Sequence, residues 1–131
     1  MKRLLNLCVA AAALVLAACQ GMPPGTTASA VVAKRMDVNG VSLAYTEQGR
    51  GSPVVMVHGC CADRRAWEPH REAIAQNHRF IALDQRYWST APWPDKGEKY
   101  SRETQIEDLA AFVRGLGSGP VHLVGWSMSG T

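Results

Sequence analysis

Residues 121–130, VHLVGWSMSG, combine a short apolar run with a serine that stands among small residues. The run at 121–124 has the length and composition of a buried strand, and Gly125 and Ser127 follow it in a pattern close to G-x-S-x-G. That pattern is typical of a strand, a sharp turn and a helix that hold the serine hydroxyl at the tip of the turn. Backbone N–H groups at the start of such a helix point to the same place, so Ser127 is the candidate nucleophile.

Two further motifs each follow a short apolar run. The run VVMV at 54–57 leads into His58 and Gly59, and the run FIAL at 80–83 leads into the segment DQR at 84–86. The carboxyl ends of parallel strands meet at one edge of a sheet, which is where α/β proteins place their sites. All three motifs therefore stand at positions suited to a common site.

Taken together and in this order, the three motifs resemble the first half of the α/β-hydrolase superfamily, over residues 31–131. The resemblance implies an α/β fold with a mostly parallel sheet and flanking helices, of which this chain holds the N-terminal part. It also implies that Ser127 attacks an ester, an amide or a C–C bond through an acyl-enzyme. A serine at this position argues against the haloalkane dehalogenases and epoxide hydrolases of the same fold, which use a carboxylate nucleophile.

The same resemblance implies roles for the residues around Ser127. The backbone N–H groups of Cys60 and Met128 would form the oxyanion hole, and His58 and Gly59 would support the loop that carries Cys60. The other residues that shape the turn, which we call the elbow, are Gly125, Trp126, Ser129 and Gly130. Ser129 departs from the family pattern, which has a glycine there because strand and helix approach closely.

None of the four histidines is a good candidate for the base that would activate Ser127. His122 lies inside the strand before the elbow, and His70 and His78 flank an expected helix at positions typical of a surface. In the α/β-hydrolase pattern the acid and then the histidine follow the serine. We therefore expect the chain to be truncated before both and to be inactive alone. The alternative is a non-catalytic lipoprotein that uses the hydrolase scaffold as a binding module.

The remaining sequence predicts the elements that would position these motifs. The expected strands lie at 31–37, 41–45, 54–57, 80–83 and 121–124, and the first helix lies at about 67–76. Asn39-Gly40 predicts a hairpin, and Ser101 is a suitable N-cap for a second helix. The helical period gives that helix one apolar face, made of Ile106, Leu109, Ala110, Val113 and Leu116. Four aromatic residues either line a pocket rim or are structural or surface residues: Tyr87, Trp88, Trp93 and Trp126.

Residues 1–30 have the composition of a leader and a tether. A basic pair at 2–3 precedes an apolar stretch at 4–16, which is too short for a spanning helix. The stretch ends in LAAC, which resembles the lipobox of bacterial lipoproteins, although an ordinary signal peptide with a chance cysteine is the alternative. The resemblance implies a cleaved segment at 1–18, a lipidated Cys19 and a flexible linker up to residue 30. The expected location is the bacterial cell envelope, with the outer membrane or periplasm favoured.

Charge and cysteine content narrow the expected partners. The formal net charge of +3 includes the two basic residues of the leader, so the remaining chain is nearly neutral and gives no sign of nucleic-acid binding. The expected substrate is a small molecule with an ester or related carbonyl, and we expect no metal or other cofactor. Of the four cysteines, only Cys60 and Cys61 remain in the domain. A disulfide between adjacent residues is strained, so we expect two thiols unless one pairs elsewhere.

Overall fold

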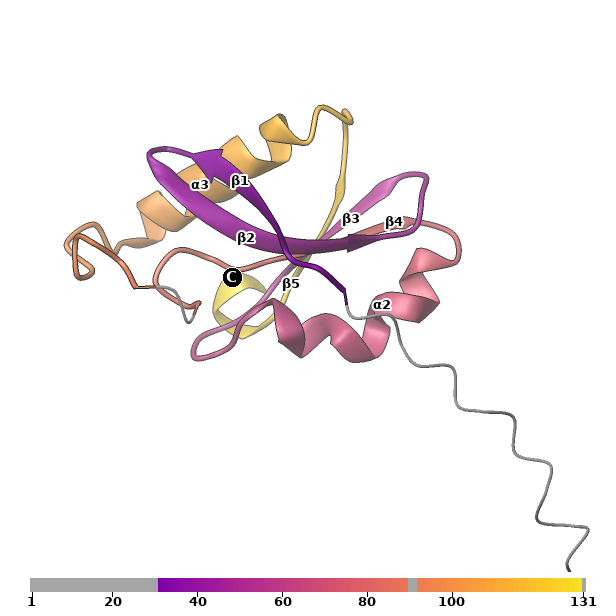
Figure 1. The fold of residues 1–131 in the computed structure, drawn as a ribbon, viewed down its shortest axis with the longest axis horizontal. Helices are drawn as coiled ribbons and strands as arrows, with labels where there is room; N and C mark the ends of the chain where they lie inside the picture. The colour runs from indigo at the N-terminus through magenta and orange to yellow at the C-terminus, as the bar shows by residue number, and fades with distance from the viewer. Residues whose placement is uncertain (1–30, 90–91, 131) are drawn as a thin grey trace, which may run out of the picture. The chain divides into compact units, whose positions relative to one another are not determined.

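The computed structural model describes residues 31–89 and 92–130, and the predicted leader, lipid site and linker lie outside these ranges. The described residues belong to one compact unit that begins at Val31. Their strands form a single sheet in the order β1-β2-β4-β3-β5 (Figure 1). Within the described ranges, no helix is long and apolar enough to cross a bilayer.

The expected α/β architecture is confirmed, with strands at or near all the expected positions. The strands are β1 (Lys34–Val38), β2 (Val41–Gln48), β3 (Pro53–Val57), β4 (Arg79–Leu83) and β5 (His122–Gly125). The helices are α2 (Glu68–Ala75) and α3 (Arg102–Gly115), and the 3-10 turns are η1 (Arg64–Trp67) and η2 (Ser127–Gly130). β3 pairs in parallel with β4 and β5, whereas the hairpin of β1 and β2 joins the other side of β4 in the antiparallel sense.

The hairpin turn follows the sequence signal. Asn39 and Gly40 both have positive φ angles, 45° and 77°, as a two-residue turn between twisted strands requires. The pairing of Val38 with Val41 closes the turn. β1 begins at Lys34, slightly later than the sequence predicted.

Alternating side chains of β3 and β4 build a core on each face of the sheet. One core joins residues of the hairpin, β3 and β4 to Phe112 of α3: Val38, Leu43, Tyr45, Val55, Val57, Ile81 and Leu83. The opposite core packs against η1 and α2 through Val54, Met56, Phe80 and Ala82. Every residue of β3 is buried, as expected for a strand covered on both faces. α3 and α2 therefore lie on opposite faces of the sheet (Figure 1).

The apolar face predicted for α3 is only partly correct. Leu109 and Leu116 do pack against the core, but Ile106 is 58% exposed. Phe112, which the period did not place on that face, is fully buried. The difference arises because Ile106 borders a cavity rather than the sheet. Ser101 caps the helix as predicted, since its hydroxyl accepts a hydrogen bond from the N–H of Thr104 at 3.1 Å.

Candidate active site

Three parallel strands end at the same edge of the sheet. The register aligns Val57 of β3 with Leu83 of β4 and with Gly125 of β5. The Trp126 N–H then donates to the Val57 carbonyl at 3.1 Å, so the pairing continues one residue beyond β5. The His-Gly loop, the DQR segment and the elbow therefore emerge side by side, which is the arrangement that the sequence predicted.

The elbow is a sharp turn with an unusual backbone. Ser127 has a φ of 55°, in the left-handed region that residues with a side chain rarely adopt. The Ser129 N–H donates to the Trp126 carbonyl at 3.2 Å and closes the turn. A Cβ added to Gly125 would lie 2.1 Å from the carbonyl oxygen of Ser129, so only glycine fits there. The strand and the following turn thus hold Ser127 at the tip.

The loop after β3 touches the serine. A Cβ added to Gly59 would lie 2.8 Å from the Cβ of Ser127 and 2.9 Å from the Trp126 carbonyl oxygen. The glycine is needed for this close approach. Cys60 and Met128, the predicted oxyanion donors, directly follow Gly59 and Ser127 in the sequence. The structure therefore brings the two backbone segments that carry these amides together at Ser127.

His58 is buried and both of its ring nitrogens are engaged. The backbone N–H of Gln85 donates to Nε2 at 3.1 Å, so the proton of the neutral ring lies on Nδ1, which donates to the Gly59 carbonyl at 2.8 Å. Burial lowers the pKa of His58 below its ordinary value of 6.5 and favours this neutral form. The side chain ties the loop after β3 to the loop after β4 and is not available as a base for Ser127.

The hydroxyl of Ser129 has partners on two neighbouring loops. It donates to the His58 carbonyl at 2.7 Å and accepts from the Gln85 side-chain amide at 3.0 Å. That amide also donates to the His58 carbonyl at 2.5 Å. The steric conflict anticipated for a side chain at position 129 is therefore absent, because the tight approach falls on Gly125 instead.

The acidic and basic residues of the DQR segment are structural. Buried Asp84 accepts from the Arg64 N–H at 2.8 Å and forms an ion pair with the Arg64 guanidinium, which fastens η1 to the end of β4. Arg86 is also buried, and its guanidinium donates twice to the carboxylate of Asp108, at 2.6 and 2.8 Å. Asp84 thus supports the loop that leads into η1. Sequence reasoning missed Asp108, although an acidic residue beside Leu109 was a visible signal.

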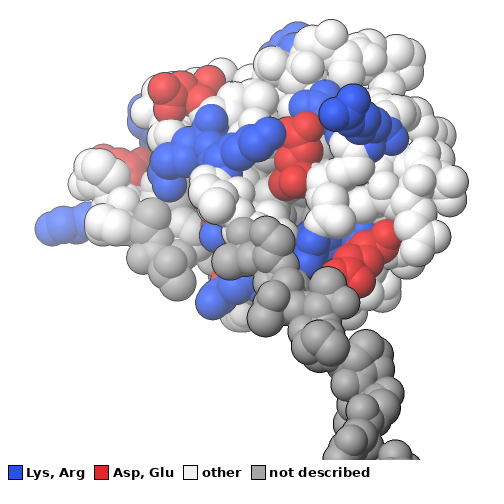
Figure 2. All heavy atoms as spheres, turned by 45° about the vertical axis from the view of Figure 1, so that its right-hand side comes forward, with Lys and Arg blue, Asp and Glu red and all other residues white. Residues whose placement is uncertain are grey.

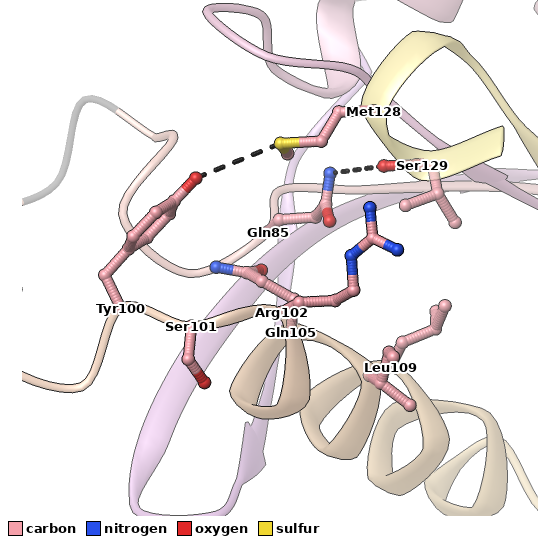
Figure 3. Close-up of a pocket in the computed structure, with 10 residues that line it drawn as sticks. Gln85, Tyr100, Ser101, Arg102, Gln105, Leu109, Met128 and Ser129 are labelled. Atoms are coloured by element: carbon pink, nitrogen blue, oxygen red, sulfur yellow. Dashed lines mark hydrogen bonds between the residues drawn. The ribbon is translucent and has the colours of Figure 1, made fainter. Parts of the chain in front are cut away.

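A cavity of about 340 Å³ lies between α3 and the elbow (Figure 3). Its apolar wall comes from Val57, Ile106, Leu109 and Met128, and its polar wall from Gln85, Tyr100, Ser101, Arg102, Gln105 and Ser129. Ser127 is not among the lining residues, so the cavity lies beside the candidate nucleophile rather than over it.

The aromatic residues named from the sequence do not line this cavity. The ring of Tyr87 packs against Trp93 at 5.4 Å and against Tyr100 at 6.0 Å, and Trp88 also packs against Tyr100 at 6.0 Å. Trp126 is 53% exposed at the surface. Tyr100 is the aromatic residue that reaches the cavity, and no periodic pattern predicted this because Tyr100 lies in a loop.

The other three histidines make their contacts away from Ser127. His78 hydrogen-bonds to the Ser52 hydroxyl at 2.9 Å, and its ring lies 6.0 Å from that of His122. His70 packs beside Trp67 at 6.0 Å. These positions agree with the prediction that none of them is a base for the serine.

Known proteins share both the sequence pattern and the fold. The chain is 31% identical over 106 residues to 2-hydroxy-6-oxo-6-(2'-aminophenyl)hexa-2,4-dienoic acid hydrolase of Metapseudomonas resinovorans, a match that covers 78% of this chain and 36% of that protein. It is 28% identical over 99 residues to epoxide hydrolase 3 of Xenopus tropicalis, covering 74% and 27%. The crystal structure of an epoxide hydrolase from Vigna radiata matches with a TM-score of 0.70 at 25% identity, covering 76% and 32%.

The chain spans about a third of the length of these relatives. Residues 52–131 match the family described as alpha/beta hydrolase fold, and this range holds the His-Gly loop, the DQR segment and the elbow. Since the match covers more than half of the chain, the chain belongs to the α/β-hydrolase fold family.

Proposed function

We propose that the protein is a serine hydrolase that acts on an ester, or on an amide or C–C bond beside a carbonyl, through an acyl-enzyme. The observation that carries this proposal is Ser127, which sits in a left-handed turn against Gly59 at the carboxyl edge of the sheet. Its hydroxyl would attack the carbonyl carbon, and water would then hydrolyse the resulting acyl ester.

The backbone amides of Cys60 and Met128 are proposed as the oxyanion hole. Both directly follow residues that touch or form the elbow, and backbone donors fixed in place stabilise the charge that develops on the carbonyl oxygen. Some relatives are named epoxide hydrolases. A serine at position 127 supports acyl transfer for this chain, because a hydroxyl nucleophile forms an ester with a carbonyl substrate.

The base and the acid for Ser127 are proposed to lie outside the described residues. The four histidines contact other groups, so none supplies the proton acceptor that Ser127 needs. The chain on its own would then have a correctly placed but unactivated hydroxyl. The same observation favours the second candidate, a non-catalytic binding module, if the gene supplies no further residues.

The test compares Ser127→Ala with Ser118→Ala, a matched control at an exposed loop serine. In the product of the complete gene, a fluorophosphonate probe should label Ser127, and Ser127→Ala should abolish the label and lower p-nitrophenyl ester hydrolysis by a factor on the order of 10³ or more. Ser118→Ala should change neither readout. A product that neither reacts with the probe nor hydrolyses the ester would support the binding module. Labelling at another serine would mean that the nucleophile is misassigned.

The protein is further proposed to be anchored to a bacterial membrane through Cys19. The support is the LAAC sequence after a short apolar stretch. Mass spectrometry of the mature protein from a bacterial host should show acyl groups on an N-terminal Cys19, and Cys19→Ser should release the protein from the membrane fraction. A mature N-terminus at another residue, without acyl mass, would show that an ordinary signal peptide is removed instead.

A further inference from the structure

Cys60 and Cys61 lie side by side in the loop that follows Gly59. Both are free thiols, as expected from the sequence, and both are exposed, with their Sγ atoms 3.0 Å apart. Adjacent side chains of an extended backbone point in opposite directions. Here Cys61 has a φ of 58°, a left-handed conformation that turns the loop. The backbone therefore presents the two sulfur atoms to each other and to solvent.

We propose that Cys60 and Cys61 are a redox-active dithiol that is reversibly oxidised to a disulfide by exchange with a disulfide-bearing oxidant. The Cys61 thiolate attacks one sulfur of the oxidant, forms a mixed disulfide and expels one thiolate. The Cys60 thiolate then attacks the Cys61 sulfur and expels the second thiolate. Two protons leave the protein thiols, one S–S bond forms in the loop, and the S–S bond of the oxidant is reduced to two thiols.

The order of attack follows from the contact between the two thiols. The pKa of the Cys60 thiol is raised, first by its hydrogen bond to Cys61 and then by desolvation. A thiol with a raised pKa is less often present as the thiolate, which is the attacking species. Cys60 is therefore better suited to the second step, in which it attacks the Cys61 sulfur, which lies 3.0 Å away in the dithiol.

The loop is fixed on both sides of the pair, so oxidation changes it locally. His58 is held by the Gln85 N–H at 3.1 Å, and the Asp63 carboxylate accepts from the Arg65 N–H at 2.8 Å at the start of η1. A disulfide bond is about 2.0 Å long. The sulfur atoms must therefore approach by about 1 Å, and residues 60–62 lie between these two held positions.

The disulfide would be easily reversed. A bond between adjacent cysteines closes a small ring that includes their peptide bond, and the strain of that ring makes the disulfide more reducible than an ordinary structural one. Strained, exposed disulfides are the labile and regulatory ones. The cysteine pair is therefore suited to reversible oxidation that responds to surrounding thiols, and not to a permanent cross-link.

Oxidation would also act on the candidate active site. This step rests on the proposed function, in which the Cys60 N–H is an oxyanion donor. Gly59, the residue before Cys60, touches Ser127. Closing the ring would rotate the peptide units around Cys60. The Cys60 N–H would then no longer point to the position of the oxyanion. The oxidised protein should then be the less active one.

The oxidation itself can be read on a single tryptic peptide of the full chain. Cleavage after Arg50 and Arg64 releases residues 51–64, which hold Cys60 and Cys61 and no other cysteine. The buffers contain glutathione at increasing ratios of disulfide to thiol. Alkylation followed by mass spectrometry should show that the doubly alkylated peptide gives way to an unalkylated peptide, which is two hydrogens lighter than the unmodified dithiol peptide. Dithiothreitol should reverse the change. Cys60→Ser and Cys61→Ser should each give only single alkylation or a glutathione adduct. A wild-type peptide that stays doubly alkylated, or ends only as glutathione adducts, would overturn the proposal.

A second arm tests the coupling to the active site in the product of the complete gene. Ester hydrolysis should fall by about 10-fold or more on oxidation and recover on reduction, because loss of one oxyanion donor has at least that effect. The activity of Cys61→Ser should not respond to the glutathione ratio. If the disulfide forms but activity is unchanged, the coupling is wrong. If there is no activity in either state, the proposed function fails while the peptide result still stands.

Discussion

Gly125 is the glycine of the elbow that leaves the least space for a side chain. Its position faces the Ser129 carbonyl, where a Cβ would come within 2.1 Å, whereas a Cβ on Gly130 would meet nothing closer than 3.4 Å. We expect Gly125→Ala to lower the free energy of unfolding by about 1–3 kcal/mol or more, because the backbone of the turn must shift. Gly130→Ala, the matched control in the same turn, should change it by less than about 0.5 kcal/mol.

Urea denaturation of the two variants measures this difference. Equal destabilisation by both would mean that the turn has another packing. The contrast isolates the steric demand of the elbow, because both changes add the same methyl group within a few residues of Ser127.

His58 makes the stability of the fold depend on pH near neutrality. Burial is the main cause that lowers the pKa of His58 in the folded protein, whereas in the unfolded chain it returns to about 6.5. Between the two values the unfolded state binds more protons, so stability rises with pH. The contribution of neutral His58 should be complete above about pH 6.5 and should be lost as the pH falls toward the folded-state pKa.

Urea unfolding between about pH 7.5 and pH 5 tests this expectation. His58→Gln removes the titrating group and should show a flatter pH dependence, even though it is less stable overall. The carboxylate of Asp63 does not confuse the comparison, because its hydrogen bond to Arg65 lowers its pKa to about 2. Identical slopes for wild type and His58→Gln would contradict the assignment.

At the scale of elements, a buried ion pair joins α3 to the loop after β4 and to the hairpin. Asp108 accepts from Arg86 twice and from the Asn39 side chain at 3.0 Å, and the Arg86 guanidinium also donates to the Asn39 carbonyl at 3.3 Å. The same pair raises the pKa of Arg86 above its ordinary value, mainly through these hydrogen bonds. Three separate segments of the chain therefore meet at one carboxylate.

Removing one member of this pair should be costly. We expect Arg86→Met to lower the free energy of unfolding by about 3–5 kcal/mol, because Asp108 would remain buried without its cation. The double variant Arg86→Met/Asp108→Leu should be more stable than Arg86→Met alone. As a control, Lys34→Ala breaks a pair with Glu47 in which the lysine side chain is 56% exposed, and it should cost less than about 1 kcal/mol. Urea titration measures the free energy of unfolding of each variant. If the effects of Arg86→Met and Asp108→Leu simply add in the double variant, the two residues are not a coupled pair.

The sequence predicted the strands and the elbow because each signal is local. An apolar run bounded by a turn identifies β3, and Gly125 and Ser127 belong to one short pattern. The apolar face of α3 was predicted only in part. A helical period shows which residues share a face, but it cannot tell whether a given helical turn packs on the sheet or borders a cavity. The roles of Asp108 and Ser129 depend on partners in distant segments, namely Arg86 and Gln85. Such contacts appear only when the elements are assembled.

At the scale of the whole molecule, the sheet formed by the described residues exposes apolar side chains at its β5 edge. In the described ranges β5 pairs with β3 alone, and Leu123 and Val124 are 54% and 36% exposed. Elsewhere charge is mixed: the face shown in Figure 2 carries basic and acidic side chains next to one another. Unpaired apolar strands recruit other chains, so the edge of β5 is the expected site of self-association.

We expect residues 20–131, expressed without the lipid, to self-associate as the concentration rises. Leu123→Lys should reduce this association, because a charge on an edge strand disfavours pairing with another chain. Val32→Lys is the control, since Val32 is 81% exposed but lies before β1 and away from that edge. Size-exclusion chromatography with light scattering provides the measurement. A wild-type chain that stays monomeric at every concentration would show that the edge is already protected.

The order of the strands also bears on when the site comes into being. β3 pairs on one side with β4, which follows it after one helix, and on the other side with β5, which follows only after a long loop and α3. Contacts between distant parts of a chain form late, because the entropy of closing the intervening loop must be overcome first. The approach of Gly59 to Ser127 depends on that late pairing. We therefore expect the folding chain to hold an ordinary, unconstrained serine until β5 docks on β3, so that the geometry of the candidate nucleophile is acquired late in folding.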